Sequence, residues 1–343
     1  MDTLLITGGC GFIGSNFIRY ALGKHPGWHI VNLDKLTYAG NPDNLREIES
    51  DDRYTFIHGD ICDRELVDNL FRERKISGVI NFAAESHVDR SIMDATAFIE
   101  TNVNGTMVLL DAARQYGIER FLQISTDEVY GELGDTGYFT ETSPVQPNSP
   151  YAASKAGADL LVKSYYRTYG LPVMIARSSN NFGPYQYPEK MIPLMIILAM
   201  EDKPLPVYGD GMNVRDWLYV DDNCAAIDAI FAEGTAGEVY NAGGNMEIAN
   251  VDLVKKLLEI LGKPDELISF VTDRPGHDRR YALDNSKIER ELGWQPGESF
   301  DDNLRETVLW YSENEDWWKK VLDKNEYKTY YQKMYTKQKE DVR

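Results

Sequence analysis

The stretch Thr7-Gly8-Gly9-Cys10-Gly11-Phe12-Ile13-Gly14 joins an apolar strand pattern, residues 4–7, to a helical pattern over residues 13–24. Its glycines satisfy both the G-x-G-x-x-G spacing and the related G-x-x-G-x-x-G spacing. Glycines at such a junction permit a tight turn, a close approach of backbone to a pyrophosphate and close packing of helix on strand, while the helix N-terminus adds free N–H donors. The stretch therefore predicts a dinucleotide site, although glycine spacing alone would also fit a structural turn. The residues expected to contact the dinucleotide here are Gly8, Gly11, Phe12, Ile13 and Gly14.

Around this stretch, the first half of the chain alternates short apolar runs with helical patterns. The strand candidates are residues 4–7, 30–33, 54–57, 79–82, 121–124 and 173–176. The helix candidates are residues 13–24, 63–75, 97–116 and 152–169. Apolar strands that alternate with single helices pair in parallel through right-handed crossovers. We therefore expect an α/β fold of the Rossmann type, with a doubly wound parallel sheet.

The alternation breaks after about Ser178, which predicts a second, smaller α/β lobe. Prolines punctuate the following stretch, and residues 191–200 form its one clear helix pattern. Farther on, residues 239–241 fit a strand and residues 251–261 a helix. The expected division is a dinucleotide-binding domain over residues 1–178, to which residues 215–250 return, and a substrate-binding lobe over residues 179–214 and 251–343.

The composition is that of a globular protein with an acidic surface. The 343 residues include 36 Lys and Arg against 55 Asp and Glu, a net charge of −19, and 43% of them are hydrophobic. Such a length allows two domains, or one domain with an elaborated lobe. The negative charge argues against nucleic acid and anionic membranes as partners, because binding to phosphate needs a basic face. An anionic ligand would need a local group of Arg and Lys.

Signals for membrane insertion, secretion and metal binding are missing from the pattern. No apolar run approaches the roughly 20 residues that span a bilayer. The N-terminus lacks the basic and long apolar regions of a signal peptide. Cys10, Cys62 and Cys224 are far apart and lack metal-ligand spacing. We expect a cytoplasmic protein with reduced, mostly buried thiols and no metal site.

Carboxylates end the second and third strand candidates. Asp34 lies twenty residues after Gly14, where a carboxylate hydrogen-bonds a ribose 2′-hydroxyl and repels a 2′-phosphate. This favours NAD over NADP, although the adjacent Lys35 weakens the inference. Asp60, followed by Ile61, is a candidate contact of the adenine or, alternatively, the N-cap of the helix over residues 63–75.

Tyr151 and Lys155 stand four residues apart at the start of a helix candidate, on one face of it. A nearby ammonium would stabilise the phenolate and lower the pKa of the tyrosine toward a range useful for proton transfer. The spacing is common by chance, but behind a dinucleotide fingerprint it indicates a catalytic pair.

Residues 7–14 together with Tyr151-x-x-x-Lys155 resemble the extended short-chain dehydrogenase/reductase family, whose members act on nucleotide sugars. The segments Ser125-Thr126-Asp127-Glu128-Val129-Tyr130-Gly131, Asn180-Asn181-Phe182-Gly183-Pro184 and Arg215-Asp216-Trp217 narrow the resemblance to the dTDP-glucose 4,6-dehydratase family. In that family, hydride leaves the sugar C4 for NAD⁺, the tyrosine takes the 4-hydroxyl proton, water is lost across C5 and C6, and hydride returns to C6. The resemblance, which runs over nearly the whole chain, implies a hydro-lyase with NAD whose 4-keto-6-deoxy product feeds deoxysugars such as dTDP-rhamnose.

The chemistry of that reaction needs an acid and a base. A 4-ketone acidifies the C5 proton, so elimination calls for a carboxylate as base and a carboxylic acid for the departing hydroxyl. Asp127 and Glu128 follow a strand at the sheet edge where α/β folds place chemistry, and like charges close together separate their pKa values. The resemblance makes Asp127 the acid and Glu128 the base, with Thr126 polarising the 4-hydroxyl beside Tyr151. A solvated turn is the alternative for the Asp-Glu pair.

Further positions are carried over from the family. Ala83 and Ala84 would let the cofactor approach, and the next residues would line the glucose, although Glu85 and His87 also fit a loop surface. A diphosphate calls for Arg, because the guanidinium forms forked hydrogen bonds to phosphate. The implied substrate contacts are Glu85, Ser86, His87, Asn180, Asn181, Glu189, Lys190, Pro206, Tyr208, Arg215, Asn250, Arg274 and His277. Tyr208 could instead belong to the core, Asn102 and Asn104 could serve only helix packing, and Arg279 and Arg280 fit a surface cluster.

Four alternatives stay open. Nucleotide-sugar 4-epimerases do not need the acid–base pair, and decarboxylases of this family typically show Ser where Asp127 stands. CDP- or UDP-glucose dehydratases are harder to exclude, because the choice of base depends on loop details. A non-catalytic NAD-binding regulator would usually lose Tyr151 or Lys155, and this chain retains both.

The family resemblance also implies a homodimer. The helices over residues 97–116 and 152–169 would meet their mates in a four-helix bundle. Leu160, Leu161, Tyr165 and Tyr166 would supply an apolar stripe there or, alternatively, face the sheet. The last thirty or so residues are rich in aromatic side chains and are expected to form a docked C-terminal segment. Its aromatic residues are Trp317, Trp318, Tyr327, Tyr330, Tyr331 and Tyr335.

Overall fold

Seven parallel strands form the central sheet, in the order β10-β6-β5-β4-β1-β2-β3. The computed structural model describes residues 2–297, 299–324 and 327–329. The strands are β1 (Asp2–Thr7), β2 (Trp28–Asp34), β3 (Tyr54–His58), β4 (Gly78–Asn81), β5 (Arg120–Thr126), β6 (Val173–Ser178) and β10 (Val239–Ala242). This order reverses direction between β1 and β4, which confirms the predicted doubly wound fold.

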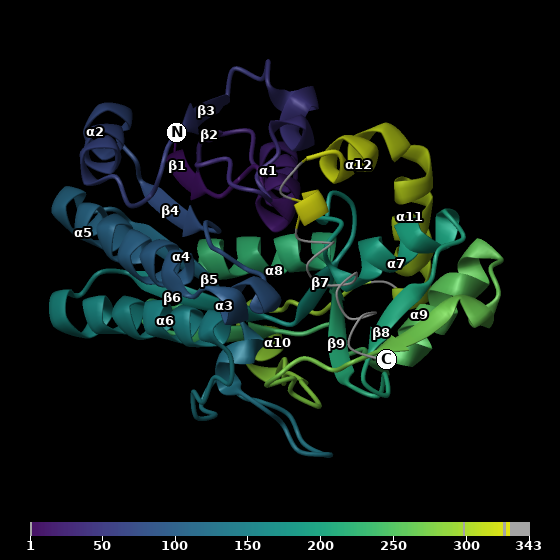
Figure 1. The fold of residues 1–343 in the computed structure, drawn as a ribbon. Coiled ribbons are helices and arrows are strands. Elements are labelled where there is room, and N and C mark those ends of the chain that lie inside the picture. The colour runs from purple at the N-terminus through teal and green to yellow at the C-terminus, as the bar shows by residue number, and fades with distance from the viewer. Residues whose placement is uncertain (1, 298, 325–326, 330–343) are drawn as a thin grey trace.

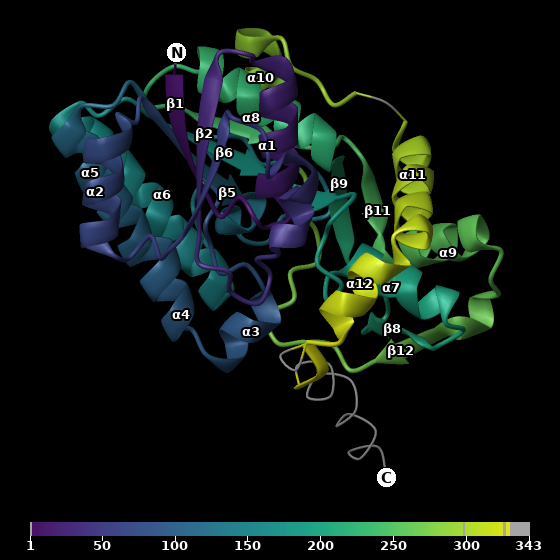
Figure 2. The same cartoon turned by 90° about the horizontal axis from the view of Figure 1, so that it is seen from above.

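The sheet strands are apolar on both faces because helices cover both faces. Leu4 and Ile6 of β1 belong to one core cluster, and Leu5 between them belongs to the other. One face is covered by α1 (Phe12–Lys24), α8 (Val220–Glu233) and α10 (Ser286–Leu292). The other face is covered by α2 (Arg64–Arg74), α5 (Thr106–Tyr116) and α6 (Pro150–Tyr169). Figures 1 and 2 show the two helical layers on either side of the sheet.

The helix expected over residues 97–116 is not a regular α-helix. A short turn, α4 (Thr96–Phe98), leads into a π-helical segment, η2 (Ile99–Gly105), and then into α5. The π-helical segment ends at Gly105, where the backbone lies close to Ile61: a Cβ at Gly105 would stand 2.5 Å from the Ile61 side chain. Before it, α3 (Val88–Met93) follows the loop after β4.

A second lobe carries two small sheets and most of the C-terminal helices. One sheet joins β7 (Asn180–Phe182), β9 (Val214–Tyr219) and β11 (Glu247–Ala249), and the other pairs β8 (Leu205–Tyr208) with β12 (Ile268–Val271). Its helices are α7 (Met191–Met200), α9 (Asn250–Leu261), α11 (Phe300–Glu313) and α12 (Glu315–Leu322). Between residues 215 and 250, β10 and α8 pack with the central sheet, whereas β9 and β11 lie in the smaller one. The division of the chain at residue 178 stays a proposal.

The C-terminal aromatic residues pack onto both halves as far as the structure describes them. Trp318 is buried in the core of the second lobe, and Tyr327 packs in a cluster with Tyr187. The indole N–H of Trp317 donates to Asn44 Oδ1 at 2.9 Å, near the glycine-rich turn over residues 8–14. Figure 2 shows α11 and α12 (yellow) beside the second-lobe helices α9 and α7. The other expected aromatic positions, Tyr330, Tyr331 and Tyr335, lie outside the described residues.

The three cysteines are unpaired, with Cys10 and Cys224 buried and Cys62 half-buried, as expected. Within the described part of the chain, no helix is long and apolar enough to cross a bilayer. The same residues contain no cluster of His, Cys, Asp and Glu arranged to hold a metal ion.

Candidate active site

The glycine fingerprint forms a turn that only glycine accommodates. Gly8 adopts φ +68°, and a Cβ there would lie 2.7 Å from the backbone of Ala83. At Gly14 a Cβ would lie 2.5 Å from the Gly8 carbonyl oxygen, so helix α1 packs directly on the turn. Gly11 is the N-cap of α1 and no side chain caps the helix. No side chain therefore competes for the first N–H groups of α1, which are available to an anionic ligand.

A cavity opens at this turn, at the carboxyl ends of β1 and β4, where the strand order reverses. We call it the cofactor cavity. It is lined by all the residues predicted to contact NAD, namely Gly8, Gly11, Phe12, Ile13, Gly14, Asp34, Asp60, Ile61, Ala83, Ala84, Tyr151 and Lys155. The uncovered helix end, the close backbone approach and the strand-end carboxylate fit a dinucleotide.

Asp34 is held in place by backbone donors. One carboxylate oxygen accepts from the Cys10 N–H at 2.8 Å and the other from the Leu36 N–H at 2.7 Å. Burial raises the pKa of Asp34, and these hydrogen bonds oppose the rise. Each oxygen keeps a further lone pair, so the carboxylate can still accept from a ribose hydroxyl.

Asp60 lines the same cavity but does not cap a helix. Its side chain accepts from the Cys62 N–H at 2.9 Å and pairs with Lys35 at 2.6 Å. The N-cap of α2 is Asp63, whose carboxylate accepts from the N–H groups of Glu65 and Leu66. The alternative role of Asp60 as that N-cap is therefore wrong, because the helix begins three residues later than the cap role requires.

Tyr151 and Lys155 both project from the first turns of α6 into the cofactor cavity. Lys155 Nζ donates to the Ile124 carbonyl at 2.6 Å, and burial lowers the pKa of Lys155 to about 8. Burial and the nearby Glu128 carboxylate raise the pKa of Tyr151, while a hydrogen bond with Thr126 opposes the rise. The predicted lowering of the Tyr151 pKa is therefore wrong as far as the protein's own groups are concerned. The Lys155 ammonium donates to a backbone carbonyl, and the Glu128 carboxylate lies near the phenol.

Asp127 and Glu128 occupy a 3₁₀ turn, η3 (Asp127–Tyr130), directly after β5. Both carboxyl groups are withdrawn from solvent, so the alternative of a solvated turn is wrong. Asp127 is only 2% exposed, and burial followed by the Glu128 charge raises its pKa well above the usual range. Burial also raises the pKa of Glu128, but the cationic side chains of Arg274, Arg215 and Lys190 oppose that rise. The two neighbours therefore differ in environment: Asp127 is favoured as a protonated acid and Glu128 as a carboxylate.

A second cavity, which we call the substrate cavity, adjoins the first. Both cavities share Ser86, Glu128, Asn180, Asn181, Glu189 and Lys190. The structure places at it all the predicted substrate contacts except Glu85, which lines the cofactor cavity instead: Ser86, His87, Asn180, Asn181, Glu189, Lys190, Pro206, Tyr208, Arg215, Asn250, Arg274 and His277. Asn180 and Asn250 each bury an amide oxygen that has no hydrogen-bond partner among the described residues. Such oxygens fit hydroxyl or base donors of a polar ligand.

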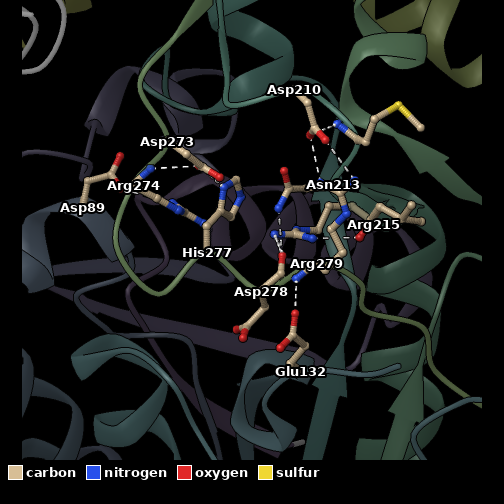
Figure 3. A network of polar contacts seen from close by, with 12 residues as sticks. Asp89, Glu132, Asp210, Asn213, Arg215, Asp273, Arg274, His277, Asp278 and Arg279 are labelled. Atoms are coloured by element: carbon tan, nitrogen blue, oxygen red, sulfur yellow. Dashed lines mark hydrogen bonds and ion pairs between the residues drawn. The ribbon is translucent and has the colours of Figure 1, made fainter. Parts of the chain in front are cut away.

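The cationic side of this cavity is a network of polar contacts (Figure 3). The Arg215 guanidinium donates to the Asp278 carbonyl at 2.9 Å and lies 4.4 Å from the centre of the Tyr281 ring. His277 Nδ1 contacts Asp273 Oδ1 at 2.6 Å, and burial together with the Arg274 charge lowers the pKa of His277 to about 4. Tyr208 lines the cavity and meets the His277 ring edge to face, with centroids 6.1 Å apart.

Arg279 and Arg280 have partners outside this cavity. Arg279 pairs with Asp210 at the surface, and Arg280 pairs with Glu247. Arg279 therefore fits the surface cluster, whereas Arg280 is mostly covered by its partners.

Comparison with known proteins places this geometry in a family. The model of a family described as GDP-mannose 4,6 dehydratase matches residues 5–307. The dTDP-glucose 4,6-dehydratase of Xanthomonas campestris pv. campestris strain B100 is 52% identical over 341 residues, which cover 94% of this chain and 97% of that protein. The chain belongs to the dTDP-glucose 4,6-dehydratase family.

Solved dehydratases of this family share the whole fold. The Bacillus anthracis dTDP-glucose 4,6-dehydratase, crystallised with NAD, is 50% identical with a TM-score of 0.88, covering 94% of this chain and 100% of that one. The Streptomyces venezuelae dTDP-glucose 4,6-dehydratase DesIV, also solved with NAD bound, is 51% identical with a TM-score of 0.91, covering 93% and 99%. These likenesses favour the dehydratase over the sibling epimerases and decarboxylases.

Several residues at the dehydratase-like site were missed from the sequence. Asp89 accepts from Arg274, and Arg90 pairs with Glu189 at 2.9 Å while its guanidinium lies 3.8 Å above the Tyr38 ring. The consecutive opposite charges directly after the segment 85–88 were the signal that could have found them.

Asn102 does more than pack a helix. Its amide accepts from the Glu85 N–H at 2.9 Å and donates to the Glu85 carbonyl at 3.0 Å and to Ser154 at 2.8 Å. It thereby ties the loop after β4 to the helix that carries Tyr151. Asn104, by contrast, donates to Glu100 on its own helical segment at 2.8 Å.

Proposed function

We propose that this chain is a dTDP-glucose 4,6-dehydratase, a hydro-lyase that converts dTDP-glucose to dTDP-4-keto-6-deoxyglucose and water with NAD in the cofactor cavity. The observation that carries the proposal is the acid–base pair Asp127 and Glu128 beside Tyr151, at the junction of the two cavities. Bound by the residues that line the cofactor cavity, NAD would supply a reversible hydride acceptor, so the reaction would leave no net NADH. The product would enter deoxysugar biosynthesis.

Tyr151 would take the proton of the 4-hydroxyl. Its hydrogen bond with Thr126 places the two hydroxyls together, so Thr126 can polarise the same sugar oxygen. To act as this base, Tyr151 must first lose its own phenol proton to solvent. Burial and Glu128 raise the pKa of Tyr151 and oppose that loss, whereas a cation near the phenolate would favour it. Lys155, which is buried and donates to the Ile124 carbonyl, is the cationic side chain of this pair.

Glu128 would remove the C5 proton and Asp127 would protonate the leaving 6-hydroxyl. The cations that face Glu128 keep it available as a carboxylate, and the burial of Asp127 keeps a proton on it. Asp127 Oδ2 is buried and has no hydrogen-bond partner within the described residues, so it is available to a substrate hydroxyl. Because Asp127 and Glu128 are neighbours in sequence, their carboxyl groups can serve the adjacent carbons C5 and C6 of one sugar.

Arg215, Arg274 and Lys190 would bind the diphosphate. They bring three cations to the substrate cavity in a chain whose net charge is −19. Forked guanidinium donors and a fixed ammonium match phosphate oxygens. Tyr208 would lie against the base, with Pro206 on the same strand.

The first test is a mass spectrum of dTDP-glucose after incubation with the purified protein, with UDP-glucose in parallel. We expect the dTDP sugar to lose one water without net NADH, and the UDP sugar to react more slowly. Faster loss of water from UDP-glucose would reassign the base. An unchanged mass with inversion at C4 by NMR would indicate an epimerase, and no change in either sugar would contradict an enzymatic role on these substrates.

We also propose a homodimer through the helical stretches over residues 97–116, which include η2 and α5, and 152–169, which lie in α6. Leu160 is 60% exposed and Tyr166 is 40% exposed, and the neighbouring Ile99 and Tyr169 are exposed as well. Leu161 and Tyr165 instead pack toward the sheet, so the alternative holds for these two. Exposed apolar side chains on adjacent helices support a four-helix bundle with a second copy. The free, mostly buried thiols support the proposal that the enzyme works in the cytoplasm.

A further inference from the structure

The loop between β12 and α10 brings two predicted substrate contacts into the cavity without regular structure of its own. Residues 272–285 contain no helix or strand, yet Arg274 and His277 line the substrate cavity. A guanidinium on an irregular loop binds a diphosphate well only if other contacts hold it before the ligand arrives. The holding contact is therefore as important as the arginine itself.

Asp89 makes that contact from the other half of the molecule. It lies in the first turn of α3, and its side chain is 5% exposed. Its Oδ1 accepts from Arg274 Nη1 at 3.1 Å, across 185 residues of chain. Figure 3 shows Asp89 and Arg274 side by side at one end of the polar network. Both residues line the substrate cavity.

The contact occupies only part of the guanidinium. Arg274 Nε is buried and has no hydrogen-bond partner among the described residues, so it remains a donor. The arginine side chain is mostly covered, with 22% of it exposed. A buried donor of this kind is costly unless a ligand or an ordered water satisfies it.

The neighbouring residue strengthens the same tie. Arg90 donates through Nη2 and Nε to Glu189 Oε2 at 2.9 and 3.2 Å, and the Glu189 side chain is 1% exposed. Two consecutive residues of α3, Asp89 and Arg90, thus each pair with an opposite charge at the wall of the substrate cavity. Asp89 is the one of the two that contacts a predicted diphosphate ligand directly.

We propose that Asp89 is a positioning residue for the diphosphate: its carboxylate fixes one end of the Arg274 guanidinium so that the buried Nε edge faces the bound nucleotide. The inference rests on the proposed function, because it assumes a nucleoside diphosphate in the substrate cavity. Asp89 acts through Arg274 and does not itself contact the phosphate, which it would repel.

The test is a double-mutant cycle on the holoenzyme, with the dissociation constant of dTDP measured by calorimetry. Asp89→Asn keeps the shape but removes the charge, and Arg274→Gln removes the cation. We expect Asp89→Asn to weaken dTDP binding about tenfold or more, the size of a charge-assisted hydrogen bond. In the Arg274→Gln background the same change should have a much smaller effect, because the guanidinium that Asp89 fixes is gone.

Two controls separate positioning from general damage. Asp210→Asn breaks the surface pair with Arg279 on the same loop and should leave dTDP binding unchanged. Thymidine, which lacks phosphates, should bind Asp89→Asn as it binds the wild type. If Asp89→Asn does not fold, Asp89→Glu is measured instead, since the added methylene displaces the carboxylate while keeping its charge.

Unchanged dTDP affinity in the Asp89 variant, an equal loss for thymidine, or an undiminished effect in the Arg274→Gln background would each overturn the inference. The proposed function is scored separately by loss of water from dTDP-glucose with the wild type. A wild type that dehydrates the sugar, together with an Asp89 variant that binds dTDP normally, would leave the function standing and remove only the role of Asp89.

Discussion

The cofactor cavity and the substrate cavity are built by different means. The first is shaped mainly by strand ends of the parallel sheet, one glycine turn and one helix N-terminus, with residues of the second lobe on its far side. The second takes side chains from loops and short strands far apart in the sequence and fixes them by ion pairs such as Asp89–Arg274. Backbone geometry decides the first site and tertiary electrostatics the second. A substitution in the cofactor cavity should therefore act through the backbone, and one in the substrate cavity through the loss of an ion pair.

The largest effect is expected where the two cavities meet. Glu128→Gln removes the proposed base while leaving both walls intact, so kcat should fall by about 10²- to 10⁴-fold, with bound NAD unchanged. The wild-type kcat/KM should fall as the pH drops through the pKa of Glu128, which burial raises above its usual range. The rate is measured by the appearance of the 4-keto product over a pH series.

The control for this substitution is Glu132→Gln, an exposed carboxylate four residues along the chain, where glutamine can still accept from the Arg279 N–H. It should leave both the rate and the pH profile unchanged. A Glu128→Gln enzyme that keeps a wild-type rate would assign the base to another group.

A backbone change should break the cofactor side alone. Gly8→Ala places a Cβ 2.7 Å from the Ala83 backbone at φ +68°, so the turn must shift and NAD content should fall severalfold or more. Strain of this kind is worth about 1–3 kcal/mol. Bound NAD per chain is measured in the purified protein after denaturation.

Gly117→Ala is the matched control, because Gly117 has φ +64° with nothing near its Cβ position. It should cost about 1 kcal/mol of stability and leave NAD content unchanged. Equal NAD loss in both variants would contradict a specific role for the close approach at Gly8.

The same contrast explains how much the sequence revealed. The sheet, its flanking helices and the lining of the cofactor cavity were predicted, because period, glycine spacing and strand-end carboxylates are local signals. Asp89 and Arg90 were missed: their consecutive opposite charges are a local sign of ion pairs, but they do not show that the partners are Arg274 and Glu189 from the other lobe. The pKa direction of Tyr151 was wrong for a related reason: the spacing to Lys155 does not reveal that the ammonium bonds to Ile124.

Lys155 is expected to destabilise the folded protein, because its side chain is buried in the active site. Burial lowers its pKa to about 8, so below that pH the native state carries a disfavoured charge. As the pH rises above about 8, the native state loses the proton before the unfolded state does, and wild-type stability should rise. Lys155→Met should therefore raise the free energy of unfolding by roughly 1–2 kcal/mol near pH 7, after the lost bond to Ile124 is deducted.

Denaturant unfolding at pH 7 and pH 10 checks this prediction. The gain should shrink at the higher pH, while activity is lost at both. A variant less stable than the wild type at pH 7 would show that the lysine contributes more through packing and its hydrogen bond than its charge costs.

The smallest effect is expected where the C-terminal helix joins the two halves. The Trp317 N–H donates to Asn44 Oδ1, and Asn44 in turn donates to the Cys10 carbonyl of the fingerprint turn at 3.0 Å. Trp317→Phe keeps an aromatic ring but leaves the Asn44 oxygen buried without this donor, which should cost about 1–2 kcal/mol in denaturant unfolding. Trp310→Phe, in the same aromatic cluster, should cost less, because its ring packs against Tyr185 and Trp317 and a phenyl ring preserves most of that contact. If both variants lose the same stability, ring packing and not the bond to Asn44 holds α12 against the cofactor-binding half.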